Sequence, residues 1–391
     1  MRRNGISRSL LTLATVVLIV SSCAPSRQTD RRSAYAKRKS GPVKIGLVWP
    51  FALYRDLIAE GVRLSVDEVN ARGGVLKRPL ELITEDDNAE VEKGLLLAET
   101  YTEDPQIMAV IGHRDSSVSL SVALTYEINN LIMFSPASTS AELTEKGYAY
   151  IFRNVPTDDL IGRKAAELCR QKELSSVAIV YSGDSYGLGM ANAFERRINE
   201  LRLKVTDRRS FNEGTPAEMD YILDRLEIYA MDGFFFAGPI DAGMIFLEKA
   251  RERGYSQPVI GGEGLDSLHL LEMEPWITKN VFIMTAYNPY SGRQASLDFN
   301  AAFLKKFGHV PDSWAALGYD AVKVLVEAME RARSPDPVAV APRLHALNNY
   351  AGVTGVHTFD EKGDVRDKTI VIKFIENRAF KYIDFKSGET E

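Results

Sequence analysis

The chain is poor in cysteine: its 391 residues include only Cys23 and Cys169. Cys169 lies in LIGRKAAELCRQ, where apolar residues recur at helical spacing. We therefore interpret it as a buried structural thiol rather than a nucleophile. If Cys23 is lipidated, as considered below, no partner remains for an intramolecular disulfide.

Motifs for nucleotides and metals are also lacking. No Gly-x-Gly-x-x-Gly and no phosphate loop follow the first expected strand, which argues against a nucleotide cofactor. His113 has no second metal ligand at a useful spacing, and the acidic run at 85–87 lacks the glycine and terminal glutamate of a calcium loop. We expect neither a cofactor nor a metal.

Positive charge is outnumbered by negative charge outside the amino terminus. Residues 1–42 hold nine Lys or Arg and one Asp, and so carry +8; because the whole chain is at −5, residues 43–391 are at −13. An acidic body argues against nucleic acid as the partner.

The only long apolar run lies within the first 23 residues and has the pattern of a secretory signal. Three arginines precede the apolar stretch 10–20, which is too short to span a membrane comfortably. The tetrapeptide VSSC ending at Cys23 resembles a bacterial lipobox, in which the cysteine becomes the lipidated first residue; an ordinary signal with an unrelated cysteine is the alternative. Ala24 follows, which resembles sorting to the outer membrane. We expect an extracytoplasmic lipoprotein anchored to a bacterial membrane.

The segment that follows the signal, residues 24–42, is polar and basic without periodicity. This composition predicts a disordered tether between anchor and folded body.

From residue 43 onward, short apolar runs alternate with amphipathic helical stretches, which predicts an α/β fold with parallel sheets. About 350 residues are too many for one core and indicate two domains. We expect strands at 43–49, 80–86, 107–112, 131–136, 176–182, 205–211, 232–238, 258–262 and 281–287, and helices near 57–71, 90–103, 117–130, 159–171, 188–201, 217–229, 241–253, 297–308 and 314–332. The last segments, 356–365 and 369–380, are predicted to form a hairpin pair.

Small hydroxyls and one acid follow several expected strands. They are Ser116 and Ser117, Ser138 and Thr139, Ser185 and Tyr186, and Glu263. In an open α/β sheet, ligands bind outside the carboxyl ends of the strands. Hydroxyls and free N–H groups at helix starts hold a carboxylate, and a lone acid holds an ammonium. The combination predicts a site for an amino-acid zwitterion.

Several motifs in order, among them NARGGV, FSPAST, YGLG, GGEG and GYDA, resemble the branched-chain amino-acid (Leu/Ile/Val) binding proteins of ABC importers. The resemblance implies a type I periplasmic binding protein fold, with two Rossmann-like lobes joined by a three-strand hinge and ligand in the cleft. It places one lobe at 43–156 and 289–362 and the other at 157–288 and 363–391. The partners implied are a small ligand, with an amino acid favoured, and an ABC permease.

The resemblance also implies a set of ligand contacts. Ser116 corresponds to the hydroxyl that binds the ligand carboxylate, and Glu263 to the carboxylate that accepts the ammonium. The full set is Tyr54, Ser116, Ala137, Ser138, Thr139, Tyr186, Glu263 and Trp314.

Four places depart from the family pattern and affect the expected side-chain specificity. They are Trp49, the pair Arg55 and Asp56, the pair Arg114 and Asp115, and the pair Pro239 and Ile240. Arg114 could pair with Asp115, or either could meet a polar ligand side chain.

Other interpretations remain open. Gly183 to Gly187 fits the Gly-x-Ser-x-Gly elbow of hydrolases, with Ser185 as nucleophile and a histidine from His269, His309, His345 or His357. A ligand-sensing lipoprotein would use the same cleft with a receptor or kinase as its partner. Ser116 and Thr139 could instead be helix N-caps, and Trp314 a core residue.

Overall fold

The computed structural model describes residues 27–366 and 368–384. The signal segment and Cys23 therefore lie outside the described residues. Nowhere in the described ranges does a helix combine the length and apolar character needed to cross a bilayer.

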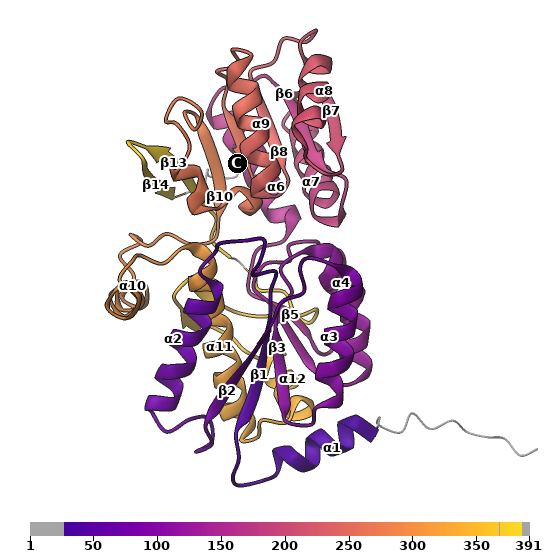
Figure 1. Cartoon of the computed structure of the whole chain (residues 1–391), viewed down its shortest axis with the longest axis vertical. Coiled ribbons are helices and arrows are strands. Elements are labelled where there is room, and N and C mark those ends of the chain that lie inside the picture. The colour runs from indigo at the N-terminus through magenta and orange to yellow at the C-terminus, as the bar shows by residue number, and fades with distance from the viewer. Residues whose placement is uncertain (1–26, 367, 385–391) are drawn as a thin grey trace, which may run out of the picture.

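The described residues form two α/β halves, one above the other in Figure 1. The first is built on a 5-stranded parallel sheet in the order β2-β1-β3-β4-β5, and the second on a 7-stranded sheet in the order β14-β13-β10-β9-β8-β6-β7. Only β13, next to the edge strand β14 of the second sheet, runs antiparallel to its neighbours. This confirms the predicted α/β class with two parallel sheets.

The strands of the first sheet are mostly continuous apolar runs because helices cover both faces. Its strands are β1 (Val43–Val48), β2 (Leu80–Glu85), β3 (Ile107–Ile111), β4 (Ile132–Ser135) and β5 (Ile151–Arg153). One face packs on α2 (Ile58–Ala71), α11 (Ser313–Ala332) and α12 (Pro337–His345), and the other on α3 (Val91–Glu103) and α4 (Ser116–Ile128). A short helix, α5 (Glu142–Glu145), lies beside α4.

The second half repeats this layering. Its strands are β6 (Ser176–Ser182), β7 (Lys204–Phe211), β8 (Gly233–Ala237), β9 (Val259–Gly261), β10 (Val281–Thr285), β13 (Val371–Glu376) and β14 (Ala379–Asp384). One face packs on α6 (Asp158–Gln171) and α7 (Ser185–Glu200), the other on α8 (Pro216–Leu226) and α9 (Ile240–Glu252). Two 3-10 turns, η1 (Glu263–Leu265) and η2 (Leu268–Leu271), follow β9.

Helix starts match their sequence signals. Thr157 and Asp184 accept N–H groups of the first turns of α6 and α7, and Thr215 forms a capping box with Glu218 at α8. Helix α10 (Gln294–Phe307) ends at Gly308, whose φ of 81° suits a residue without Cβ.

The hairpin pair expected over 356–365 and 369–380 is confirmed in part: Phe359 and Val365 form an antiparallel bridge, and the second hairpin extends beyond residue 380. β13 pairs with β14, which follows it along the chain, and β12 (Gly355–His357) pairs with β11 (Tyr350–Gly352). Each of these strands therefore pairs with the next strand along the chain, across a turn of two residues.

The disordered tether predicted for 24–42 is wrong over its described part, because helix α1 (Arg27–Ala36) forms there. Its Arg32 side chain is buried and donates hydrogen bonds to the carbonyl oxygens of Thr102 at 2.7 Å, Ile107 at 2.9 Å and Asn129 at 3.1 Å. These carbonyls lie where β3 begins and where α3 and α4 end. Helix α1 is thus fixed at the end of the first half that faces away from the second half (Figure 1).

Candidate ligand-binding site

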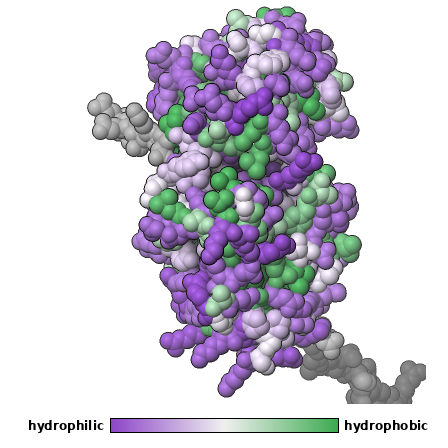
Figure 2. Space-filling model, turned by 60° about the vertical axis from the view of Figure 1, so that its left-hand side comes forward, coloured by the Kyte–Doolittle hydropathy of each residue, from purple (hydrophilic) through white to green (hydrophobic). Residues whose placement is uncertain are grey.

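A cavity of about 270 Å³ lies between the two halves, at the carboxyl ends of their strands. Residues of the first half and of the second half both line it, as expected for the edge where parallel strands end. The lining residues are Tyr54, Ala89, Arg114, Asp115, Ser116, Ser117, Ala137, Asp184, Tyr186, Pro239, Glu263, Gly264 and Trp314. In Figure 2 apolar residues gather at the narrow middle of the molecule, where the halves meet.

Six of the eight predicted contacts line this cavity: Tyr54, Ser116, Ala137, Tyr186, Glu263 and Trp314. Ser138 and Thr139 do not. The buried Ser138 hydroxyl contacts Ser119 Oγ at 2.5 Å and donates to the Arg114 carbonyl at 3.2 Å. Ser138 therefore fixes the loop after β3 rather than facing the cavity.

The carboxylate end predicted for the ligand lies at the start of α4. Ser116 is the first residue of this helix, and the preceding Asp115 makes no side-chain capping bond. The first-turn N–H groups beside Ser116 and Ser117 are therefore not occupied by a side-chain cap, and helix starts favour anions. The alternative in which Ser116 or Thr139 is an N-cap is wrong, since Asp115, Ala141 and Thr157 hold the cap positions of α4, α5 and α6.

The ammonium end predicted for the ligand lies across the cavity, where two buried acids adjoin. Glu263 is 8 % exposed and Asp158 2 %. Among the described residues, neither oxygen of the Asp158 carboxyl, nor Glu263 Oε2, nor the Thr139 hydroxyl has a well-formed hydrogen bond, although the Thr139 hydroxyl lies close enough to both acids to lower their pKa. Burial raises the pKa of Glu263 to about 8, with Asp158 adding to the effect, and burial raises the pKa of Asp158 to about 7. Such a group of unpaired acceptors is completed by a cation.

Asp158 was missed by sequence reasoning. It is the first residue of α6, directly after the Thr157 cap, so its sequence signal is that of an ordinary acidic first turn. Only the fold brings Asp158 next to Glu263, which lies about 100 residues later in the chain, in the loop after β9.

Glycines place Glu263. A Cβ on Gly262 or on Gly264 would lie 2.8 Å from the Tyr186 hydroxyl. The Tyr186 hydroxyl accepts the Gly264 N–H at 3.1 Å. Tyr186 therefore packs directly on the GGEG loop, and the loop presents Glu263 to the cavity.

Arg114 is held among aromatic rings and acids. Its guanidinium carbon lies 3.5 Å from the centroid of the Tyr54 ring and 5.1 Å from that of Trp314. Its nearest carboxylate oxygens belong to Asp56 at 3.6 Å and Asp115 at 3.7 Å. Arg114 is thus loosely paired with Asp115, and both line the cavity; contact of either with a ligand side chain stays a prediction.

Trp314 has two roles. Only 4 % exposed, it packs in the first core, donates Nε1–H to the Asp266 carbonyl at 2.9 Å and also lines the cavity. The core interpretation and the pocket interpretation therefore both hold.

No histidine is hydrogen-bonded to Ser185 in the part of the chain that the structure describes. The four candidates bond elsewhere: His269 to Glu272, His309 to the Val310 carbonyl, His345 to two carbonyls, and His357 to Lys368. Ser185 begins α7 and does not line the cavity. The elbow motif thus serves as a turn and helix start, capped by Asp184.

His113 lies in a structural network. Its Nδ1 is 2.6 Å from Asp87 Oδ2 and its Nε2 3.1 Å from the Tyr126 hydroxyl, and all of its surface is buried. Within the described residues no group of three or more potential metal ligands occurs.

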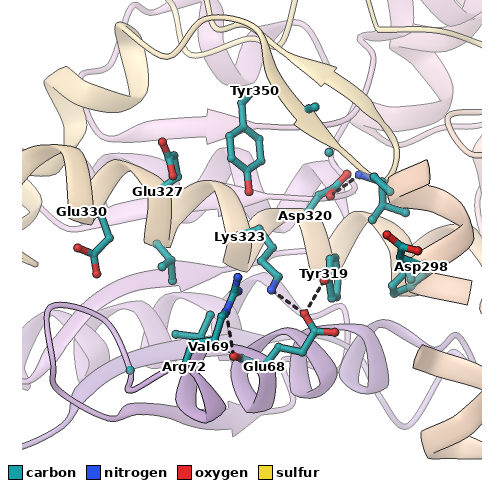
Figure 3. A pocket seen from close by; sticks show the side chains of 17 residues that line it. Glu68, Val69, Arg72, Asp298, Tyr319, Asp320, Lys323, Glu327, Glu330 and Tyr350 are labelled. Carbon is teal, nitrogen blue, oxygen red and sulfur yellow. Dashed lines mark hydrogen bonds and ion pairs between the residues drawn. The ribbon is translucent and has the colours of Figure 1, made fainter. Parts of the chain in front are cut away.

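A larger hollow of about 570 Å³ lies elsewhere, between the carboxyl-terminal half of α2 and α11 (Figure 3). Its charges are already engaged: Glu68 accepts from the Tyr319 hydroxyl and from Lys323 Nζ, each at 2.7 Å. It lies away from the carboxyl ends of the strands. The interlobe cavity, with unpaired acceptors facing a free helix start, is therefore the better candidate.

Comparison with known proteins agrees with this geometry. A substrate-binding protein of an ABC transporter from Desulfitobacterium hafniense, solved in complex with Leu, is 37 % identical, with a TM-score of 0.79, and the match covers 88 % of this chain and 100 % of that one. A leucine-binding protein from Thermotoga maritima is 25 % identical, with a TM-score of 0.80, over 87 % of this chain and 97 % of that one. A Leu/Ile/Val-binding protein homologue from Brucella melitensis is 27 % identical over 82 % of this chain and 86 % of its own length. Residues 42–372 match the family described as periplasmic binding protein, and the chain belongs to that family.

Proposed function

We propose that the protein captures an amino acid or a closely related small zwitterion between its two halves and delivers it to an ABC importer. The observation that carries this proposal is that one cavity is lined both by a helix start that favours a negative charge and by a buried acid that favours a positive one. Ser116 begins a helix whose first turn has no side-chain cap, and Glu263 and Asp158 are neighbouring buried acids whose oxygens find no hydrogen-bonded cation among the described residues. A zwitterion satisfies both ends at once.

The mechanism is closure of a hinge, without covalent chemistry. The lobes are 43–156 with 289–362 and 157–288 with 363–391, joined by three crossings. Ser116 and Ala137 belong to one lobe and Glu263 to the other. Because only the closed state brings both ends of the ligand into contact, the ligand shifts the equilibrium toward closure.

The relatives support the amino-acid assignment. The solved Desulfitobacterium protein contains Leu, and a Pseudomonas aeruginosa relative, 25 % identical, is described as binding leucine, isoleucine, valine, threonine and alanine. We further propose that Cys23 carries the lipid and holds the protein on the outer face of a bacterial membrane, with the permease as its partner.

The test is calorimetric titration of the polypeptide that begins at residue 24, unfolded and refolded first to remove any retained ligand. It is titrated with the L-amino acids. We expect one or more zwitterions to bind and Glu263→Gln to weaken that binding at least about 30-fold, because the ammonium loses its buried charge partner.

The matched control is Glu248→Gln, an exposed glutamate on α9 that is expected to leave the affinity unchanged. Equal affinity of Glu263→Gln and the wild type would show that the ammonium site is assigned to the wrong residue. Binding of plain carboxylic acids in place of zwitterions would overturn the proposed ligand class.

A further inference from the structure

Arg114 and Asp115 form a loose ion pair in which one buried atom of each side chain has no hydrogen-bond partner among the described residues. The Arg114 side chain is 9 % exposed, yet within the described part of the chain its guanidinium donates no hydrogen bond, and its nearest carboxylates lie 3.6 and 3.7 Å away. Arg114 Nε and Asp115 Oδ2 are both buried without a partner among the described residues. Leaving such groups unpaired is costly, so they mark a place where a ligand completes the structure.

The surrounding residues hold Arg114 in position. Trp49 is fully buried and donates Nε1–H to both oxygens of Asp56 at 3.0 Å. Asp56 lies beside Arg114, and the Tyr54 ring lies flat against the guanidinium. Residues that depart from the family pattern therefore form one connected cluster beside the cavity. They are Trp49, Asp56, Arg114 and Asp115.

The pair lies in the cavity proposed to hold the zwitterion. Arg114 and Asp115 line the same cavity as Ser116, Ala137 and Glu263, and Tyr54 and Trp314 contact the guanidinium. The side chain of an amino acid held by Ser116 and Glu263 is therefore within reach of Arg114 and Asp115.

The pair's chemistry separates the classes of side chain. An apolar side chain would leave both groups desolvated and unpaired. A carboxylate would meet Arg114 but be repelled by Asp115 and Asp56, and a cation would meet Asp115 but be repelled by Arg114. A carboxamide presents an acceptor and a donor side by side: its oxygen can accept from Arg114 while its NH₂ donates to Asp115.

We propose, resting on the proposed function, that Arg114 and Asp115 make the cleft selective for amino acids whose side chain ends in a carboxamide, such as L-asparagine or L-glutamine. Discrimination arises because a site built to hydrogen-bond a polar group rejects analogues that lack it.

The test uses ligands of equal shape. L-asparagine, L-aspartate and L-leucine have nearly the same side-chain shape, and L-glutamine with L-glutamate repeats the comparison one methylene longer. In titrations of the refolded wild type, we expect one of the two amides to bind about 10- to 100-fold more tightly than its acid and than leucine. Arg114→Met is expected to remove that preference, and Arg114→Leu combined with Asp115→Ala to favour leucine.

Arg163→Met, which removes an exposed arginine from α6, is the matched control and is expected to keep the preference. Circular dichroism establishes that each variant is folded. Leucine or an acid binding the wild type as tightly as the amides would overturn the amide selectivity while leaving amino-acid capture intact. Failure of every amino acid to bind would overturn both, and Glu263→Gln would then have no binding to weaken.

Discussion

At the scale of single residues, the site is built from groups that are poorly satisfied by the protein alone. Six buried polar atoms of five residues at or beside the cavity lack a hydrogen-bond partner among the described residues: Glu263 Oε2, both carboxyl oxygens of Asp158, the Thr139 hydroxyl, Arg114 Nε and Asp115 Oδ2. Other buried charges, such as Arg32 and Arg153, are fully engaged. Unpaired buried groups lower the stability of the ligand-free protein.

Glu263→Gln is therefore expected to stabilise the ligand-free protein at high pH. Burial raises the pKa of Glu263 from 4.5 to about 8, so the folded state binds the proton more tightly than the unfolded chain. The stability that this proton contributes is fully present below about pH 4.5 and is lost as the pH rises through about 8. Glutamine stays neutral, so the variant keeps the stability that the wild type loses.

The measurement is the melting temperature of ligand-free wild type and variant between pH 4 and pH 9. The two curves should meet near pH 4 and separate by several degrees near pH 8 to 9, with the variant higher. A separation that stays constant over this range would contradict a role for titration of Glu263.

At the scale of elements, most helices and strands follow from the alternation of apolar runs and amphipathic stretches. Strands such as β3 and β8 are fully buried, so every residue in them is apolar or small and the pattern is plain. Helix α1 was not predictable in this way. Its most deeply buried side chain is that of Arg32, with Tyr35 also buried, and a buried arginine has the same sequence signal as a solvated one.

Arg32→Met is expected to destabilise the protein by about 2 kcal/mol, because methionine fills part of the space but leaves the carbonyls of Thr102, Ile107 and Asn129 without their donor. Chemical denaturation of the polypeptide from residue 24 measures this. Arg31→Met, one position earlier and exposed, is the matched control and is expected to be neutral. Equal stability of the two variants would mean that α1 does not contribute to the folded body.

At the scale of the whole molecule, one residue joins the two halves. Asp266, after η1, is ion-paired with Lys373 on β13 and accepts hydrogen bonds from Thr285 at 2.5 Å and Ser313 at 2.7 Å. Ser313 begins α11 of the first half, whereas Thr285 and Lys373 belong to strands of the second. The contacts with Lys373 and the two hydroxyls outweigh the effect of burial and hold the pKa of Asp266 below its usual value.

Asp266→Asn should lower the free energy of unfolding by about 3–5 kcal/mol at neutral pH, because it leaves the buried Lys373 ammonium without its counter-charge. Urea denaturation measures the loss. Adding Lys373→Met to this variant should recover much of it, since the unpaired charge is then gone. No recovery in the double variant would show that the loss comes from the hydroxyl network instead.

The sequence predicts the two-half plan and the position of the cleft, since small hydroxyls and an acid follow the strands that end there. Six residues of the expected contact set line the cavity, Tyr54, Ser116 and Glu263 among them. The Ser138 side chain is buried in the protein instead, and Asp158, which the sequence did not indicate, lies next to Glu263. Both outcomes depend on how loops from distant parts of the chain pack together, and no local pattern reports that.

The position of helix α1 has a consequence for how the protein would sit on a membrane. With a lipid on Cys23, only residues 24–26 would separate the anchor from a helix fastened to the base of the first half, and four peptide units reach at most about 14 Å. The first half would then keep a nearly constant height above the bilayer, with the amino-terminal ends of its strands toward the lipid and the cleft away from it. In opening and closing, the second half would move while the first half stays fixed relative to the membrane.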